Sequence, residues 1–250
     1  MSQKRTVVDR SGPDPDFPWM AAEQRMRFPD PATAPAFAPL AHGGNLSPGM
    51  LLSAYESGIF PWYSQEDPVL WWSPDPRFVI FPENVHISES MRKVLRQHRF
   101  HFTFDSFFIE VITSCSAAPR PGQDGTWITP DIVTAYAELH RLGYAHSVEA
   151  WLDGQLVGGL YGVSVGQIFC GESMFSRVSN ASKACFLTLA VQLKQLGVPV
   201  IDSQVHTKLF ESLGAGHISR ESYLQLLQEH RTKPLLHGSW KNRFVSDPGW

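Results

Sequence analysis

The chain has 250 residues, of which 43% are hydrophobic and 18% are charged, and its formal net charge is −3. This length and composition predict a globular protein with either one large domain or two smaller ones. The small negative charge argues against a protein that coats nucleic acid, because such proteins neutralise many phosphates with an excess of Lys and Arg.

No stretch approaches the roughly 18 apolar residues of a membrane helix, and the first residues are polar, so we expect a cytoplasmic protein with no membrane partner. Cys115, Cys170 and Cys185 are widely spaced and include no C-x-x-C pair. They predict reduced thiols rather than a disulfide framework or a zinc site. The histidines form no H-E-x-x-H motif, so no metal is expected either.

The N-terminal part divides into a lead-in and a small domain. Residues 1–40 are rich in Pro and Ala and lack periodicity, which predicts an extended or partly disordered segment. Ser47 and Pro48 then mark a helix start, and Gly58 marks its end. Aromatic residues follow, and the proline-marked segment up to residue 76 indicates a domain boundary. We therefore expect a small N-terminal domain over residues 41–76 and a larger domain over 77–250.

In the larger domain, helix and strand patterns alternate and then give way to a mostly β region. The pair Asp153-Gly154 is a strong two-residue hairpin signal between two apolar strands. The predicted strands cover residues 78–81, 100–104, 145–152, 155–165, 167–170 and 198–204. The predicted helices begin after Ser88, at Asp105, after Thr129 and after Asn180, and the last two end at Gly143 and Gly197.

Three polar residues follow apolar strands, where binding sites often form. Glu172 follows the strand over 167–170 after Gly171, at a point where we expect the chain to change direction. Asp202 and Gln204 are two residues apart on a strand, so alternation predicts that they share one face. The alternatives are a solvated turn for Glu172 and a cap on the next helix for Asp202.

Several blocks resemble one family, the leucyl/phenylalanyl-tRNA–protein transferases, in the same order over roughly residues 40 to 230. Long independent blocks in the right order are more specific than any single short motif. The blocks are Phe60-Pro61-Trp62-Tyr63-Ser64, residues 70–77 (LWWSPDPR), Gly125-Thr126-Trp127-Ile128-Thr129, residues 156–163 (LVGGLYGV), Gly171-Glu172-Ser173-Met174-Phe175-Ser176, Asn180-Ala181-Ser182-Lys183, Ile201-Asp202-Ser203-Gln204 and Ser212-Leu213-Gly214-Ala215.

The resemblance implies an α+β fold with a small N-terminal domain and an acyl-CoA N-acyltransferase-like (GNAT-like) mixed-sheet domain. It implies transfer of leucine or phenylalanine from aminoacyl-tRNA to the α-amino group of proteins that begin with Arg or Lys, which marks them for degradation by an N-degron pathway. The aminoacyl ester is already activated, so no cofactor is expected. A hydrocarbon pocket separates similar side chains weakly, so methionine should also be tolerated.

The resemblance also implies roles for individual residues. Asp202 and Gln204 occupy the family's catalytic positions, and we expect Gln204 to donate or accept hydrogen bonds, because a neutral amide is a poor base. Glu172 matches the acid that contacts the acceptor peptide. Trp62 and Trp127 match the tryptophans beside the 3′-terminal adenosine, although each alone would suit a core. For the aminoacyl side chain we predict a pocket formed by Leu160, Phe169, Met174 and Phe175.

One predicted helix carries a basic face formed by Arg92, Lys93 and Arg96, which we assign to the tRNA backbone. The alternative is the ordinary solvated face of an amphipathic helix. A tRNA-binding adaptor without catalysis would also use these residues. Binding without transfer of an amino acid would identify such an adaptor.

Three enzyme alternatives fit less well. Residues 162–166 match the G-x-S-x-G motif, but Ser164 lies within a strand rather than at a strand-to-helix turn. The glycines from Gly44 to Gly49 have phosphate-loop spacing but lack the lysine. An acyl-CoA acyltransferase needs a glycine-rich cradle for pyrophosphate, and residues 177–184 contain no glycine.

Departures from the family pattern are few. His42, Asn45 and Ser203 replace residues that the family favours, and the segment 207–211 differs from it. Ser203 should point away from Asp202 and Gln204, so we expect little effect there. Because segment 207–211 differs from the family, the resemblance says less about the binding site for the acceptor protein.

Overall fold

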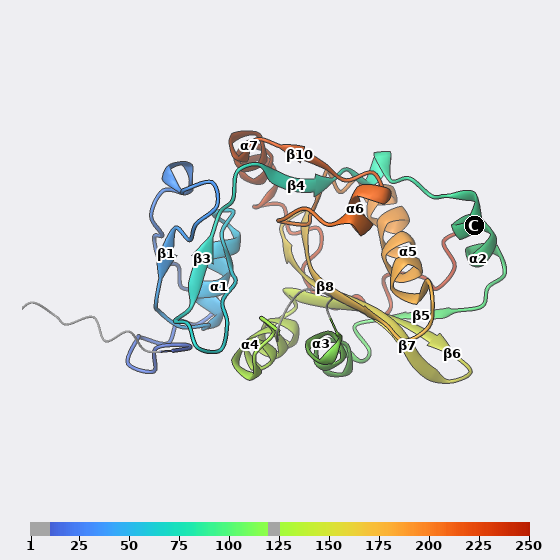
Figure 1. The fold of residues 1–250 in the computed structure, drawn as a ribbon, viewed down its shortest axis with the longest axis horizontal. Helices are drawn as coiled ribbons and strands as arrows, with labels where there is room; N and C mark the ends of the chain where they lie inside the picture. Colours follow the sequence, from blue (N-terminus) through green and yellow to red (C-terminus); the bar gives the residue numbers. More distant parts are fainter. Residues whose placement is uncertain (1–10, 120–125) are drawn as a thin grey trace, which may run out of the picture.

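The computed structural model describes residues 11–119 and 126–250, and its strands form one small and one large sheet. Figure 1 shows the small sheet and α1 at one end, and the large sheet with its helices filling the rest. Residues 1–10 of the predicted lead-in, and Gly125 of the predicted tryptophan block, lie outside the described residues. Among the described residues, none of the helices has both the length and the apolar character needed to cross a bilayer.

The small unit consists of a three-stranded sheet and α1. Its strands, in the order β1-β3-β2, are Ala41–His42, Leu70–Trp72 and Phe60–Pro61. The α1 helix, Pro48–Tyr55, begins after Ser47, and Gly58 follows it with a φ of 74°, a left-handed conformation that suits glycine. Residues 11–40 form little regular structure apart from a 3₁₀ turn, η1, over Pro31–Thr33. They nevertheless pack on this unit, because Phe28 is buried with its ring 5.0 Å from that of Trp71.

The large sheet has seven strands in the order β10-β4-β9-β8-β7-β6-β5. Strands β8 and β9 pair in parallel and the other neighbours pair antiparallel. This mixed sheet, with helices on it and a separate small unit, confirms the predicted α+β fold class. The strands are β4 Arg77–Ile80, β5 His101–Phe104, β6 Ala145–Leu152, β7 Gln155–Val165, β8 Ile168–Ser176, β9 Ile201–Asp202 and β10 Gly216–Ile218.

Helices cover both faces of the large sheet. Helix α5, Ala181–Gln195, packs on one face of β6 and β7, and α3, Phe108–Ala117, packs on the other face beside α4, Pro130–Arg141 (Figure 1). The remaining helical elements are η2 Pro82–Asn84, α2 Glu89–Arg96, α6 Lys208–Ser212 and α7 Arg220–His230.

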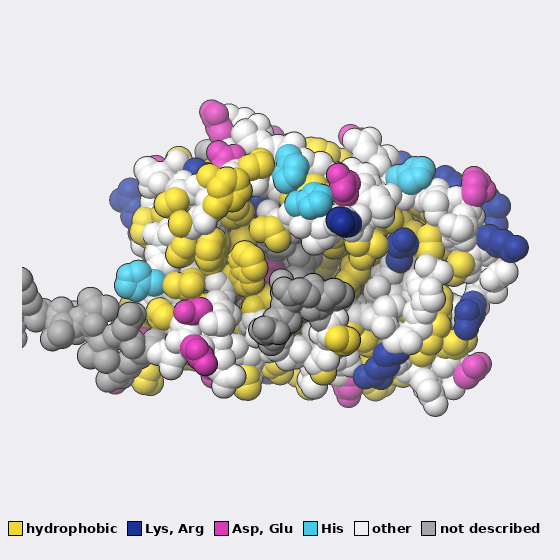
Figure 2. All heavy atoms as spheres, viewed as in Figure 1, with side chains coloured by type: hydrophobic (Ala, Val, Ile, Leu, Met, Phe, Trp, Pro, Cys, Tyr) yellow, Lys and Arg dark blue, Asp and Glu magenta, His cyan; other side chains and the backbone are white. Residues whose placement is uncertain are grey.

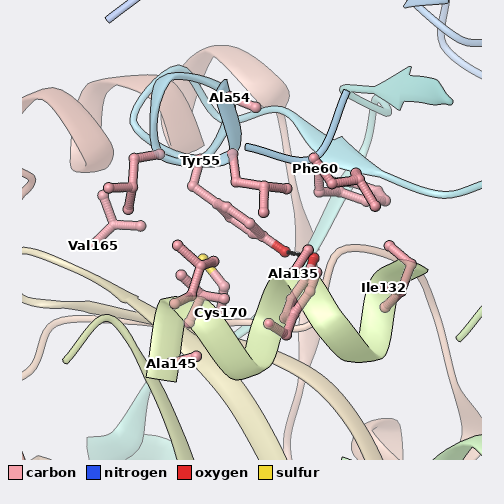
Figure 3. Packing of buried hydrophobic residues seen from close by; sticks show 14 of the residues in the cluster. Ala54, Tyr55, Phe60, Ile132, Ala135, Ala145, Val165 and Cys170 are labelled. Carbon is pink, nitrogen blue, oxygen red and sulfur yellow. Dashed lines mark hydrogen bonds between the residues drawn. The ribbon is translucent and has the colours of Figure 1, made fainter. Parts of the chain in front are cut away.

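The two faces have separate hydrophobic clusters, and one of them extends into the small unit. Leu51 and Tyr55 of α1 belong to the same buried cluster as Val111 of α3 and Tyr136 of α4. Figure 3 shows Tyr55 extending from α1 toward Ala135 of α4. The small unit therefore shares its core with the α3 and α4 side of the large domain.

Most predicted elements appear, but two strand boundaries were wrong. The strand predicted to end at Cys170 continues to Ser176, and the one predicted over 198–204 is only Ile201–Asp202. In β8, Tyr161 pairs with Ser173 and the next residue, Gly162, pairs with Gly171, so Glu172 is the extra residue of a β-bulge. The prediction that the chain changes direction at Glu172 was wrong, because β8 continues past this residue. The bulge alone redirects this side chain.

Candidate functional site

A cavity of about 290 Å³ lies between the small unit and the large sheet. Its wall combines β2, parts of β7 and β8, Ile201 at the start of β9, Ser203 and Gln204 after β9, and residues of α5 and α6. Figure 2 shows hydrophobic side chains gathered over the small unit, in the left part of the view. A largely apolar cavity with a few polar groups is the usual form of a small-ligand site.

Glu172 brings a carboxylate into this cavity. Its Oε1 accepts hydrogen bonds from the Tyr55 hydroxyl at 2.7 Å and from the Gln204 side-chain nitrogen at 3.3 Å. Burial raises the pKa of Glu172 to about 8, a rise that the hydrogen bond from Tyr55 opposes. The carboxyl group is therefore poised to gain or lose a proton near neutral pH.

A tyrosine pair supports Glu172 from behind. The hydroxyls of Tyr55, the last residue of α1, and Tyr136, in α4, lie 2.5 Å apart. Burial is the main cause that raises the pKa of both phenols well above the usual value, and the charge of Glu172 adds to it. Both tyrosines therefore stay protonated and can donate hydrogen bonds.

Gln204 lies beside Glu172 in an unusual backbone conformation. Its φ is 57°, in the left-handed region that residues other than glycine rarely adopt. Its backbone N–H donates to Oδ1 of Asp202 at 3.0 Å. This local hydrogen bond favours the turn that directs the amide to the cavity.

Asp202 lies behind the cavity rather than in its wall. It is fully buried, and both carboxylate oxygens are held by Arg77, at 2.8 Å from Nε and 2.6 Å from Nη2. The hydroxyl of Tyr223 donates to Oδ2 at 2.9 Å. The predicted shared face of Asp202 and Gln204 was wrong, because β9 ends at Asp202. Instead Ser203, predicted to point away, lines the cavity with Gln204.

Three of the four predicted pocket residues line the cavity. Leu160, Phe169 and Met174 do so, but Phe175 does not. Phe175 is on the other face of β8 and packs near Gly159 and Val111. Alternation along the strand explains this correction, because Met174 and its neighbour cannot both face the cavity.

The cavity wall also contains residues that the sequence did not single out. Phe186 of α5 and Phe210 of α6 meet edge to face with ring centres 4.9 Å apart, and Leu209 lies next to them. Phe186 belongs to a helix with buried residues on several sides, and no sequence signal separates a cavity wall from ordinary core there.

Trp62 and Trp127 both line the cavity, and Trp62 keeps 36% of its surface exposed. The indole of Trp72 donates to the backbone oxygen of Trp62 at 2.6 Å, which fixes the chain at this point. The basic residues Arg92, Lys93 and Arg96 are exposed on α2 and do not line the cavity. Figure 1 places α2 at the end of the molecule away from the small unit.

The rejected G-x-S-x-G serine takes part in a buried polar cluster. Ser164 Oγ lies 3.2 Å from Nε2 of His146, whose Nδ1 lies 3.0 Å from Asp105. This resembles a hydrolase triad, but Ser164 is 2% exposed and none of the three residues lines the cavity. The ring of Trp240 also stacks on His146 at 3.9 Å. A substrate therefore has no access to this serine.

Three residues that hold the site from outside were not predicted from the sequence, namely Arg77, Tyr55 and Tyr223. A signal for Arg77 existed, because an arginine at the start of an apolar strand requires a carboxylate partner when it is buried. The tyrosines carried no comparable signal. Within the part of the chain that the structure describes, no group of three or more His, Cys, Asp or Glu side chains is arranged to hold a metal ion.

Comparisons with known proteins agree over most of the chain. The family described as leucyl/phenylalanyl-tRNA protein transferase matches residues 79–228, and the N-terminal domain of the same family matches residues 44–75. A protein of Syntrophus aciditrophicus named leucyl/phenylalanyl-tRNA–protein transferase is 52% identical over 213 residues, 85% of this chain and 89% of its own. One of that name from Chromobacterium violaceum is 48% identical over 229 residues, 92% of this chain and 94% of its own.

Among solved structures, a GCN5-related N-acetyltransferase from Kribbella flavida matches 69% of this chain and 62% of its own, with a TM-score of 0.30 and 10% sequence identity. That likeness is too low to carry an argument about function.

Proposed function

The chain belongs to the leucyl/phenylalanyl-tRNA–protein transferase family and is an aminoacyltransferase, and we propose that it acts on proteins that begin with Arg or Lys. The donor is aminoacyl-tRNA, with leucine or phenylalanine as the transferred residue. The observation that carries the proposal is the pairing of Glu172 with the amide of Gln204 at a hydrophobic cavity.

The reaction is aminolysis of an ester. The neutral α-amine of the acceptor attacks the aminoacyl carbonyl, a C–N bond forms, and the C–O bond to the terminal ribose breaks. The amine gives up one proton and the ribose oxygen takes one. An α-amine has an ordinary pKa of about 7.7 to 8.0, so a useful fraction is neutral without a strong base. Alignment of the two reactants then supplies the largest effect, worth about 7 to 11 kcal/mol in well-oriented systems.

The donor occupies the apolar part of the cavity. Leu160, Phe169 and Met174 surround the leucine or phenylalanine side chain, and methionine is tolerated because such a pocket distinguishes one methylene by only about 1 to 3 kcal/mol. Trp62 and Trp127 stack on the terminal adenosine, where a base on an aromatic ring is worth about 1 to 3 kcal/mol. Arg92, Lys93 and Arg96 contact the tRNA backbone farther away.

The acceptor binds through Glu172. A guanidinium or ammonium group that enters this partly buried position gains a charge-assisted hydrogen bond. The cation also favours the ionised carboxyl and so lowers its pKa from about 8. Recognition of a basic first residue is thereby coupled to ionisation of Glu172.

Gln204 orients the attacking amine. Its side-chain nitrogen donates to Glu172, so its carbonyl oxygen is the atom that accepts an N–H of the amine. Asp202 acts on the reaction indirectly, because it holds the backbone of Gln204. The transfer places a bulky hydrophobic residue at the acceptor's N-terminus, and we propose that this marks cytoplasmic proteins for N-degron degradation, without a metal or cofactor.

The test is transfer of labelled leucine from leucyl-tRNA to three peptides that differ only in the first residue, Arg, Lys or Ala. We expect transfer to the first two peptides and much less to the third. Glu172→Ala should reduce transfer to the basic peptides at least about tenfold more than residual transfer to the Ala peptide. Equal losses on all three would contradict the contact with the basic residue.

A second arm separates the alternatives. Acetyl-coenzyme A in place of leucyl-tRNA should give no product. Acetylation without leucine transfer would indicate an acyl-CoA acyltransferase, and tRNA binding without transfer would indicate an adaptor. Either result would overturn the proposal.

A further inference from the structure

Arg77 is the first residue of β4 and is fully buried. It forms a two-pronged ion pair with Asp202, at 2.8 Å and 2.6 Å, and its Nη1 donates to the backbone oxygen of Gly58 at 3.1 Å. A guanidinium group removed from water is costly unless it is paired in this way. Arg77 does not line the cavity, so the site for substrates does not include it.

The guanidinium is also held in orientation by two aromatic rings. It lies 4.4 Å from the ring centre of Tyr223 and 4.9 Å from that of Phe60. Tyr223 itself donates to Asp202 at 2.9 Å. Asp202 is therefore fixed on two sides, by a planar cation and by a phenol.

Asp202 in turn holds the backbone of Gln204 by a hydrogen bond. Its Oδ1, which accepts from Arg77, also accepts the N–H of Gln204 at 3.0 Å. Gln204 needs such support, because its φ of 57° is unfavourable for a residue with a side chain. A change in the position of Asp202 would therefore move the amide that lies 3.3 Å from Glu172.

We propose that Arg77 is a positioning residue for aminoacyl transfer, which acts through Asp202 on the amide of Gln204. This inference rests on the proposed function, because the role of Gln204 in the reaction is part of it. The chain of contacts runs from Arg77 to Asp202, to the backbone of Gln204, and from its amide to Glu172. Lysine cannot replace arginine in this chain, because an ammonium group does not form the two-pronged pair.

The test is a double-mutant cycle of leucine transfer with Arg77→Lys and Gln204→Ala. Misplacement of a reacting group by about 1 Å can cost on the order of 100-fold, so Arg77→Lys should lower kcat about 10- to 100-fold. The KM for the peptide should change less than about threefold. In the Gln204→Ala background, the same Arg77→Lys change should lower kcat less than about threefold, because its target is gone. Single-turnover reactions with excess enzyme allow the slow variants to be measured.

The matched control is Arg220→Lys, which alters a second buried arginine. Arg220 binds the backbone oxygens of Ser73 and Ala34 and has no contact with Asp202. Loss of stability alone would affect both variants in the same way. We expect any effect of Arg220→Lys on kcat to be the same factor in both backgrounds.

If Arg77→Lys does not fold, a milder variant tests the same inference. Tyr223→Phe removes one donor to Asp202 and leaves the ion pair, so kcat should fall a few-fold in the wild-type background and not in the Gln204→Ala background. Equal factors in both backgrounds, or a change in KM alone, would overturn the inference. Failure of the unaltered enzyme to transfer leucine would instead contradict the proposed function itself.

Discussion

Glu172 has neighbours that oppose its ionisation and neighbours that support it. Burial raises its pKa to about 8, the hydrogen bond from Tyr55 lowers it, the charge of Asp202 raises it, and that of Arg77 lowers it. Without a bound cation, this carboxyl group is therefore mostly protonated below about pH 8. Under the proposed function, a basic acceptor ionises this group as it binds, so the affinity for the acceptor depends on pH.

This raised pKa also predicts how stability depends on pH. The folded pKa of about 8 exceeds the ordinary value of 4.5, so the folded chain retains a proton that the unfolded chain loses between these values. The resulting stability is fully present below about pH 4.5 and is lost as pH rises through about 8. Glu172→Gln removes the effect, so the variant should gain stability relative to wild type from pH 6 to pH 9, by on the order of 1 kcal/mol. Urea denaturation at each pH measures this difference.

The control is Glu83→Gln, at an exposed position in η2. Its free energy of unfolding should follow the wild-type curve at every pH. A Glu172→Gln curve parallel to wild type would show that Glu172 does not carry the proton.

Among the structural elements, the bulge in β8 and the helix α6 are short, but both place side chains in the cavity wall. The bulge turns Glu172 into the site and shifts the cavity-facing residue after it to Met174. Helix α6 begins at Lys208 after Thr207, whose hydroxyl accepts from the N–H of Phe210 at 3.2 Å. Segment 207–211, which we predicted to differ from the family, contributes Leu209 and Phe210 to the cavity wall.

Phe210→Ala should change the preference between donors. Removal of the ring that meets Phe186 enlarges the end of the cavity, so phenylalanine should gain over leucine by about tenfold in the ratio of their kcat/KM values. Transfer from phenylalanyl-tRNA and leucyl-tRNA to one Arg-started peptide measures the ratio. Glu211→Ala, at the next and exposed position, should leave it unchanged. The same loss for both donors would place Phe210 outside the selective part of the pocket.

The loop between β5 and α3 contains Asp105, which has a structural role in the buried cluster that it forms with His146 and Ser164. Asp105 accepts from the backbone N–H of Ser147 at 3.0 Å, from that of Trp240 at 2.7 Å, and from Nδ1 of His146. Burial lowers the pKa of His146 although Asp105 opposes this, so the imidazole is neutral at physiological pH. The cluster joins β6 to the C-terminal segment and lies outside the cavity.

Asp105→Asn should therefore lower stability without slowing transfer. Asparagine tolerates the positive φ of 51° at this position, but its amide nitrogen cannot accept the hydrogen bonds. We expect a loss of about 2 kcal/mol in the free energy of unfolding, measured in urea, and a kcat within about twofold of wild type for the folded fraction. Glu110→Ala, on the exposed side of α3, is the control for stability. A large fall in kcat at unchanged stability would reopen the hydrolase interpretation.

In the molecule as a whole, the small N-terminal unit completes the site. Tyr55 of α1 donates to Glu172, the backbone oxygen of Gly58 accepts from Arg77, and Trp62 forms part of the cavity wall. Arg220 of α7 connects the same unit to the large domain through the oxygens of Ser73 and Ala34. Neither unit contains the site by itself.

Helix starts and turns that depend on local signals were predicted from the sequence. Features of the site that depend on long-range contacts were not. Ser88 accepts from the N–H of Met91 and begins α2 as expected, and Asp153-Gly154 forms the predicted turn between β6 and β7. The bulge at Glu172 depends on pairing with β7, which sequence alone cannot locate. The left-handed Gln204 depends on Asp202, and Asp202 depends on Arg77, 125 positions away in sequence. The family resemblance identified most of the cavity-facing residues and Asp202, but it assigned no role to Tyr55, Arg77 and Tyr223 behind them.

The shared core predicts that both units unfold in a single transition. Leu51 and Tyr55 of the small unit are buried in one cluster with Val111 and Tyr161 of the large domain, so separation of the units would expose apolar surface on both. Urea unfolding followed by far-UV circular dichroism should coincide with unfolding followed by tryptophan fluorescence. Trp71→Phe removes a buried indole from the small unit and Trp240→Phe removes one from the large domain, and the curves of both variants should each remain single. A fluorescence transition at lower urea that disappears with Trp71→Phe would show that the small unit opens first, and that its share of the core is too weak to hold the site closed.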